Sequence, residues 1–84
     1  MKYRSRLSII HDILASLYEG PKRVSHLARD ANLPVDRLNR ILEVLEADGM
    51  VGRDGPLIYM TERGRDAFLE IKRVKRILDR LGIK

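Results

Sequence analysis

The sequence predicts a mainly α-helical domain with one small β-hairpin and a long C-terminal helix. Apolar residues recur at intervals of three and four over four segments, which is the period of helices that pack one face on a core. The dipeptide Asp54-Gly55 separates two short apolar runs, a pattern typical of a hairpin turn. With 84 residues, of which 44% are hydrophobic, the chain fits a single domain.

The first predicted helix covers residues 5–18. Ser5 suits its N-cap, and Gly20-Pro21 ends it. Its apolar face consists of Leu7, Ile10, Ile13, Leu14 and Leu17. Ile9 and Tyr18 lie off this face, so we expect them to contact a second surface, such as a partner subunit. Residues 22–24 are expected to form an extended connector.

Two further helices follow, joined by a short turn. Ser25 is expected to cap the first of them, which ends at Asn32, and Leu33-Pro34 turns the chain. The second ends at Asp48-Gly49, and its apolar stripe consists of Val35, Leu38, Ile41, Leu42 and Leu45. A short helix, a tight turn and a longer helix make a helix-turn-helix.

The hairpin is expected to pair residues 50–53 with residues 57–60. A two-residue turn at Asp54-Gly55 would place Val51 opposite Ile58, with both residues and Met60 facing the core. Thr61 is expected to cap a fourth helix that runs to about Leu81.

The fourth helix carries an apolar seam with alternating spacings of four and three. Its members are Ala67, Ile71, Val74, Leu78 and Leu81. This spacing is typical of a short coiled coil, so we expect the seam to form a homodimer. The alternative is that the helix folds back and buries the seam on the first helix. Phe68, beside the seam, is expected to reach the core of its own subunit.

The charge of the chain favours a polyanionic partner. There are 17 Lys and Arg residues against 12 Asp and Glu, a formal net charge of +5. The absence of cysteine excludes disulfides and thiolate chemistry, and two histidines are too few for a metal site. No catalytic constellation stands out, so we expect no enzyme activity, cofactor, metal or small-molecule ligand. No apolar run approaches the roughly 18 residues of a membrane span, and we expect a cytoplasmic protein.

Candidate DNA contacts lie on the outward side of the third helix. Arg pairs bidentately with guanine and Asn with adenine, so the expected base readers are Asp36, Arg37, Asn39 and Arg40. The alternative is that these are ordinary surface neighbours. The expected phosphate contacts are Arg4, Arg6, Lys22, Arg23 and Arg53. The polar back of the fourth helix, with Lys72, Arg73, Arg76 and Arg80, is a solvated face or a further phosphate contact, and less readily a membrane surface.

Several stretches resemble one family of proteins. They are residues 3–7 and 9–14, Glu19-Gly20-Pro21-Lys22, Ala31-Asn32-Leu33, Asp48-Gly49-Met50-Val51 and residues 59–64. Together with the order of the elements, they resemble small archaeal winged helix-turn-helix DNA-binding proteins, some of which dimerise through their C-terminal helices. The resemblance implies a winged helix-turn-helix DNA-binding domain in residues 1–66 and a dimerisation segment in residues 67–84.

The function expected from the sequence is therefore that of a homodimeric transcriptional regulator that binds double-stranded DNA at the nucleoid. Two alternatives stay open at this stage. One is an architectural chromatin protein with little base preference, and the other is a winged-helix module that docks onto another protein.

Overall fold

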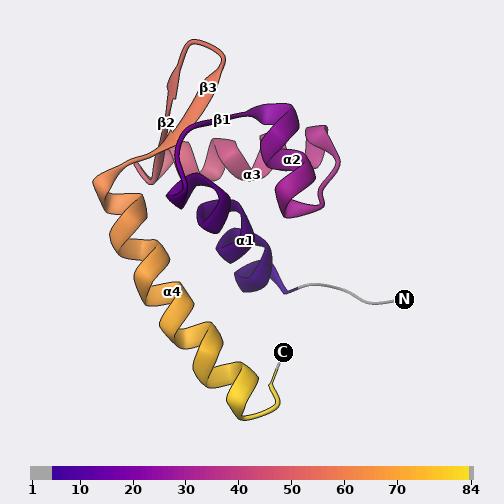
Figure 1. Ribbon diagram of the computed structural model, residues 1–84, viewed down its shortest axis with the longest axis vertical. Coiled ribbons are helices and arrows are strands. Elements are labelled where there is room, and N and C mark those ends of the chain that lie inside the picture. Colours follow the sequence, from indigo (N-terminus) through magenta and orange to yellow (C-terminus); the bar gives the residue numbers. More distant parts are fainter. Residues whose placement is uncertain (1–4, 84) are drawn as a thin grey trace.

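The chain described by the computed structural model runs from residue 5 to residue 83 (Figure 1). Its elements are α1 (Arg6–Tyr18), β1 (Lys22–Arg23), α2 (Val24–Ala31), α3 (Val35–Ala47), β2 (Val51–Asp54), β3 (Leu57–Met60) and α4 (Glu62–Arg80). The mainly α-helical fold class predicted from the sequence is confirmed, including the hairpin and the long C-terminal helix. None of these helices is long and apolar enough to cross a membrane.

Local capping fixes the starts of α1 and α4 as predicted. The Ser5 hydroxyl accepts a hydrogen bond from the Ser8 amide, and the Thr61 hydroxyl accepts one from the Gly64 amide. The prediction for Ser25 was wrong, because α2 already begins at Val24, after Arg23, and has no side-chain cap. Asn32 ends α2 in the left-handed conformation, with a φ of 55°.

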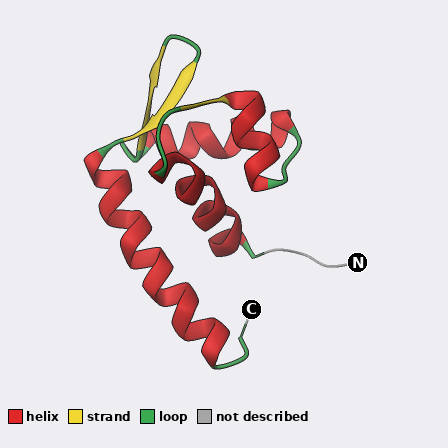
Figure 2. Cartoon of the chain, in the orientation of Figure 1, coloured by secondary structure: helices red, strands yellow, loops and turns green. Residues whose placement is uncertain are grey.

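The sheet has three antiparallel strands in the order β1-β3-β2. The expected extended conformation is confirmed at Lys22 and Arg23, which pair with β3, whereas Val24 already belongs to α2. The hairpin of β2 and β3 projects from the helices (Figure 2).

The register of the hairpin differs from the prediction by two residues. Val51 lies opposite Met60 and Arg53 opposite Ile58, so that Gly55-Pro56 forms the loop. This loop places Pro56, which cannot donate a backbone hydrogen bond, outside the ladder and gives the positive φ of 60° to Gly55. A shift of two residues preserves the two faces, so Val51 and Ile58 are buried as expected.

The core lies between α1, α2, α3 and the sheet. Its most completely buried side chains are Ile13, Leu14, Leu27, Leu38, Leu42 and Ile58. Ile9 is only 2% exposed, so the expectation that it lines a second surface was wrong. Val35 is also not in the core: it is half exposed, because it lies at the N-terminal end of α3 beyond the packed part of the helix.

Helix α4 lies beside α1 (Figure 1). Phe68 is buried, as predicted, and its ring centroid lies 5.5 Å from that of His11 and 5.1 Å from that of Tyr18. Ile71 also packs against the core. The globular unit therefore extends into the first half of α4.

A close approach of two backbones fixes the start of α4. A Cβ atom on Gly64 would overlap the carbonyl group of Met50. The same carbonyl oxygen accepts the hydrogen bond of the Thr61 amide, so it cannot move aside freely. Glycine is therefore the residue that fits where α4 passes Met50, just before the start of β2.

Candidate nucleic-acid interface

Helix α3 turns a polar face to solvent. Leu38, Ile41, Leu42 and Leu45 are buried on one side, and the 3.6-residue period then directs Asp36, Arg40 and Glu43 outward. Arg37 is exposed on one flank of this face, and Asn39 is half-buried on the other. The residues singled out as base readers thus lie together on the accessible side of one helix.

The two arginines of this face are free to bind a partner. Neither Arg37 nor Arg40 pairs with a carboxylate of residues 5–83, although Asp36 and Glu43 are close in sequence. Each guanidinium keeps its planar set of five N–H donors, which matches the O6 and N7 acceptors of guanine. This face can therefore read base edges.

An ion pair joins the hairpin to α3. Arg53 Nε of β2 lies 3.1 Å from Glu46 Oε1 of α3, and each side chain is 41% exposed. Asn39 lies two turns before Glu46 on the same flank of the helix. The structure thus brings Arg53 beside the polar face of α3, as a phosphate contact of this face requires.

Lys22 has a different place from the one expected. Its side chain is only 12% exposed, and Nζ donates to the Ser16 carbonyl oxygen at 2.8 Å and to the Ser16 hydroxyl at 2.9 Å. The same ammonium lies 3.1 Å from a Glu19 carboxylate oxygen and 3.3 Å from Asp30 Oδ2. Lys22 therefore connects β1 to α1 and α2. Because its ammonium is bonded within the chain, Lys22 is not expected to contact a phosphate.

The carboxylate of Asp30 completes this cluster. The Ser16 hydroxyl donates to Asp30 Oδ2 at 2.7 Å, and this bond is the main cause that holds the pKa of Asp30 below its ordinary value of 3.8. Desolvation acts in the opposite direction, while Lys22 and His26 help to lower the pKa. The cluster favours a charged Asp30 in the folded chain.

The remaining expected phosphate contacts are scattered. Arg23 is exposed on β1. Arg6 is exposed at the start of α1, which Figure 1 shows at the end away from the hairpin that carries Arg53. Arg4 lies outside the described residues. Within residues 5–83, no group of three or more His, Asp and Glu side chains could hold a metal ion.

Comparison with known proteins identifies this arrangement. The sequence profile of the winged helix-turn-helix family matches residues 3–79. The chain belongs to this family. None of the curated protein sequences compared with this winged helix matches it.

Solved structures share the fold. The transcriptional regulator BldR from Sulfolobus solfataricus matches with a TM-score of 0.77 and 25% identity, over 88% of this chain and 60% of that chain. Ligand-free NadR matches with a TM-score of 0.72 and 25% identity, over 92% and 59%. This winged helix thus spans about three fifths of the length of BldR and NadR. Sso10a-2, a DNA-binding protein from Sulfolobus solfataricus, has a TM-score of 0.81 over 93% of this chain and 85% of its own, and its 20% identity shows the fold alone.

The wing carries a tyrosine that sequence reasoning missed. Tyr59 of β3 lies opposite Gly52 of β2, and its ring occupies the space that a side chain on Gly52 would need. The ring is 37% exposed on the face of the sheet turned away from the core. A cross-strand pair of glycine and an aromatic residue is visible in a sequence only when the register is known.

The predicted seam of α4 divides into two halves. Ala67 and Ile71 are half-buried, and Ile71 packs on the winged-helix core. Val74 is 43% exposed and Leu81 is 64% exposed, while Leu78 is half-buried. Ile77, which was not part of the predicted seam, is 40% exposed. On the back of the helix, Lys72, Arg73, Arg76 and Arg80 are all exposed.

Proposed function

We propose that the chain is a transcriptional regulator that binds double-stranded DNA as a homodimer, with α3 in the major groove. The observation that carries this proposal is that Arg37 and Arg40 lie on the accessible face of α3 without a carboxylate partner among residues 5–83. In a helix-turn-helix this helix is the one that enters the groove. The likeness to BldR, a transcriptional regulator, supports the same role.

Each residue of the face has a chemical role in this proposal. Arg37 and Arg40 bind guanine bidentately, Asn39 binds adenine, and the carboxylate of Asp36 accepts from the amino group of cytosine. Arg53, Arg23, Arg6 and Arg4 contact phosphates, which fix the position of the protein on the duplex. Lys22 is left out, because its ammonium is bonded within the chain. No step of this role needs catalysis, and binding to DNA would place the protein at the nucleoid.

The proposed dimer rests on the second half of α4. Val74, Ile77 and Leu81 leave apolar surface open to water at the end of the helix, beyond the part that packs on α1. A two-fold partner covers such a stripe with its own copy. It also supplies the second recognition helix, and the two helices of such dimers read half-sites about 34 Å apart.

A competition titration tests the proposal. The wild-type chain is bound to a labelled duplex selected from a random pool and is challenged with single-base variants of that duplex. Arg37→Ala and Arg40→Ala are expected to weaken binding by about 1 to 3 kcal/mol each and to relax the preference at the position they read. Arg76→Ala, an exposed arginine on the back of α4, is the matched control and should change the base preference little.

Two outcomes would contradict the proposal and favour another function. Equal affinity for all duplexes, unchanged by Arg37→Ala and Arg40→Ala, would indicate an architectural protein that reads only the backbone. Absence of binding at low salt would indicate a docking module. The salt dependence adds a second check, because log affinity should fall by about 0.9 per log unit of salt for every phosphate contacted.

A further inference from the structure

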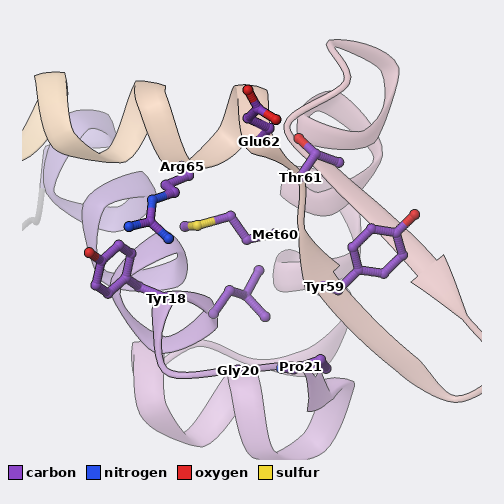
Figure 3. Close-up of a pocket in the computed structure, with 9 residues that line it drawn as sticks. Tyr18, Gly20, Pro21, Tyr59, Met60, Thr61, Glu62 and Arg65 are labelled. Carbon is purple, nitrogen blue, oxygen red and sulfur yellow. The ribbon is translucent and has the colours of Figure 1, made fainter.

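A cleft of about 410 Å³ lies where the end of α1, the end of β3 and the start of α4 meet. Tyr18 comes from the end of α1, Met60 from the end of β3, and Arg65 from the first turns of α4 (Figure 3). Leu17 and Pro21 complete its apolar walls. The volume is at the small end of the range for ligand sites, so it suits a compound with a single ring.

Arg65 supplies the positive charge of this cleft. Its guanidinium carbon lies 5.2 Å from the centroid of the Tyr18 ring, and Figure 3 shows the side chain pointing toward that ring. Arg65 forms no ion pair with any carboxylate of the described chain. Glu62, one turn earlier on α4, points away from Arg65 in the same view. Among residues 5–83, the Arg65 guanidinium is therefore left without a carboxylate partner, and its N–H donors remain open to a ligand.

The other walls are aromatic or polarisable. Tyr18 is 45% exposed although Phe68 packs against it, so part of its ring surface faces the cleft. In Figure 3 the Met60 thioether lies between the Tyr18 side chain and β3. Thr61 is not available to a ligand, because its hydroxyl donates to the Gly49 carbonyl and accepts from the Gly64 amide. A planar ring gains stacking on tyrosine and contacts to sulfur in such a place.

We propose that the cleft between Tyr18, Met60 and Arg65 binds a small aromatic carboxylate. The ring lies against Tyr18 and Met60, and the carboxylate accepts two parallel hydrogen bonds from the Arg65 guanidinium. Neither half of the ligand suffices alone: a neutral ring leaves Arg65 unpaired, and a simple carboxylate leaves the apolar walls in water. Binding involves the protein alone, so this inference stands or falls separately from DNA recognition.

Titration of the 84-residue chain with benzoate, followed by NMR, tests the proposal. The methyl signal of Met60 and the ring signals of Tyr18 should shift along a saturable curve. Benzamide lacks the charge and acetate lacks the ring, and both should bind at least about tenfold more weakly, as the loss of a charge-assisted hydrogen bond predicts for benzamide. Arg65→Gln should weaken benzoate binding by a similar factor, and so should Tyr18→Leu.

The control variant is Arg76→Gln, an exposed arginine further along α4, which should leave benzoate affinity unchanged. Unchanged backbone spectra of Arg65→Gln away from the cleft establish that the variant is folded. Equal curves for wild type and Arg65→Gln, or for benzoate and benzamide, would overturn the proposal. So would signals of Met60 and Tyr18 that respond to protein dilution but not to benzoate, because the cleft would then be a contact between copies of the chain.

Discussion

Arg53 of β2 donates a hydrogen bond to the carboxylate of Glu46 in α3, with 3.1 Å between Nε and Oε1. This pair connects a side chain of the wing to the proposed recognition helix. Because both side chains are 41% exposed, water screens the pair, and pairs of this kind contribute about 0 to 1 kcal/mol to stability. The Arg53 guanidinium is also a proposed contact of a DNA phosphate. We therefore expect the pair to affect DNA binding more than stability.

Replacing Glu46 with Gln tests which role the pair plays. The substitution keeps the size of the side chain and removes its charge, so Arg53 becomes free and a repulsive charge near the phosphates is lost. DNA affinity should rise, with stability changed by less than about 1 kcal/mol. Glu70→Gln, which removes the carboxylate beside Arg73 on α4, is the control. If Glu46→Gln instead weakens binding, the carboxylate is needed to position Arg53.

Lys22 is expected to act on stability and not on DNA binding. Lys22→Met keeps the apolar stem of the side chain but removes the bonds to Ser16 and Asp30, which should cost about 1 to 3 kcal/mol. Urea denaturation measures this loss, and a DNA titration under folding conditions should show nearly wild-type affinity. The matched control is Arg23→Met, at the exposed neighbouring residue of β1. This variant should keep its stability but bind DNA more weakly. A stable Lys22→Met variant with reduced DNA affinity would contradict this assignment.

The Asp30 cluster predicts a loss of stability in acid. The hydrogen bond from Ser16 lowers the pKa of Asp30 in the folded chain below 3.8, so the unfolded chain takes up the proton first as the pH falls. The stabilisation is therefore fully present above about pH 5, declines as the pH falls below that, and is gone below the folded pKa. Denaturation midpoints between pH 7 and pH 2 measure it. In Ser16→Ala the denaturation midpoint should fall less steeply with decreasing pH. If Asp30→Asn loses as much stability in acid as the wild type, other carboxylates cause the loss.

Gly64→Ala is expected to destabilise the fold. The new methyl group would overlap the carbonyl of Met50, which is held by its bond to the Thr61 amide. Overpacking of this kind costs about 1 to 3 kcal/mol, and the strain falls on backbone atoms with little freedom to adjust. Thermal unfolding measures the effect. Arg63→Ala, at the exposed preceding residue, should stay within about 0.5 kcal/mol of wild type, and equal stability of the two variants would contradict the close approach.

The sequence was sufficient for features that depend on neighbours along the chain. The caps at Ser5 and Thr61 need only a hydroxyl three residues before an amide, and the outward face of α3 follows from its buried stripe. The faces of the hairpin were right although the register was wrong, because side chains alternate with a period of two.

Other features depend on contacts between distant residues. Nothing near Lys22 in the sequence shows that Asp30 and Ser16 surround its ammonium. The sequence therefore predicted a solvent-exposed lysine that contacts phosphate, whereas the ammonium is bonded within the chain. Ile9 lies off the predicted apolar face of α1, yet it is buried, because the core surrounds more of α1 than a single stripe covers. The cleft at Arg65 joins α1, β3 and α4, and no local pattern predicts such a junction.

The last prediction concerns the second half of α4. Val74 and Leu81 are exposed in the single chain, and a large apolar side chain gains about 1.5 to 3 kcal/mol when it is fully buried. Leu78 is half-buried within its own chain, so its replacement would disturb the monomer as well. Val74→Glu combined with Leu81→Glu changes only the exposed positions and places like charges at the centre of a two-fold contact.

Sedimentation and DNA titration separate the two arrangements that α4 allows. If the exposed half forms the dimer, the double variant should sediment as a folded monomer and lose affinity for a two-site duplex, because each half-site then binds alone. Leu69→Glu is the matched control: this leucine is 46% exposed but lies on another side of α4, so its replacement should leave the mass and the affinity unchanged. A double variant that keeps the wild-type mass would instead show that α4 serves its own chain, through Phe68 and Ile71 on α1, and that any dimer forms elsewhere.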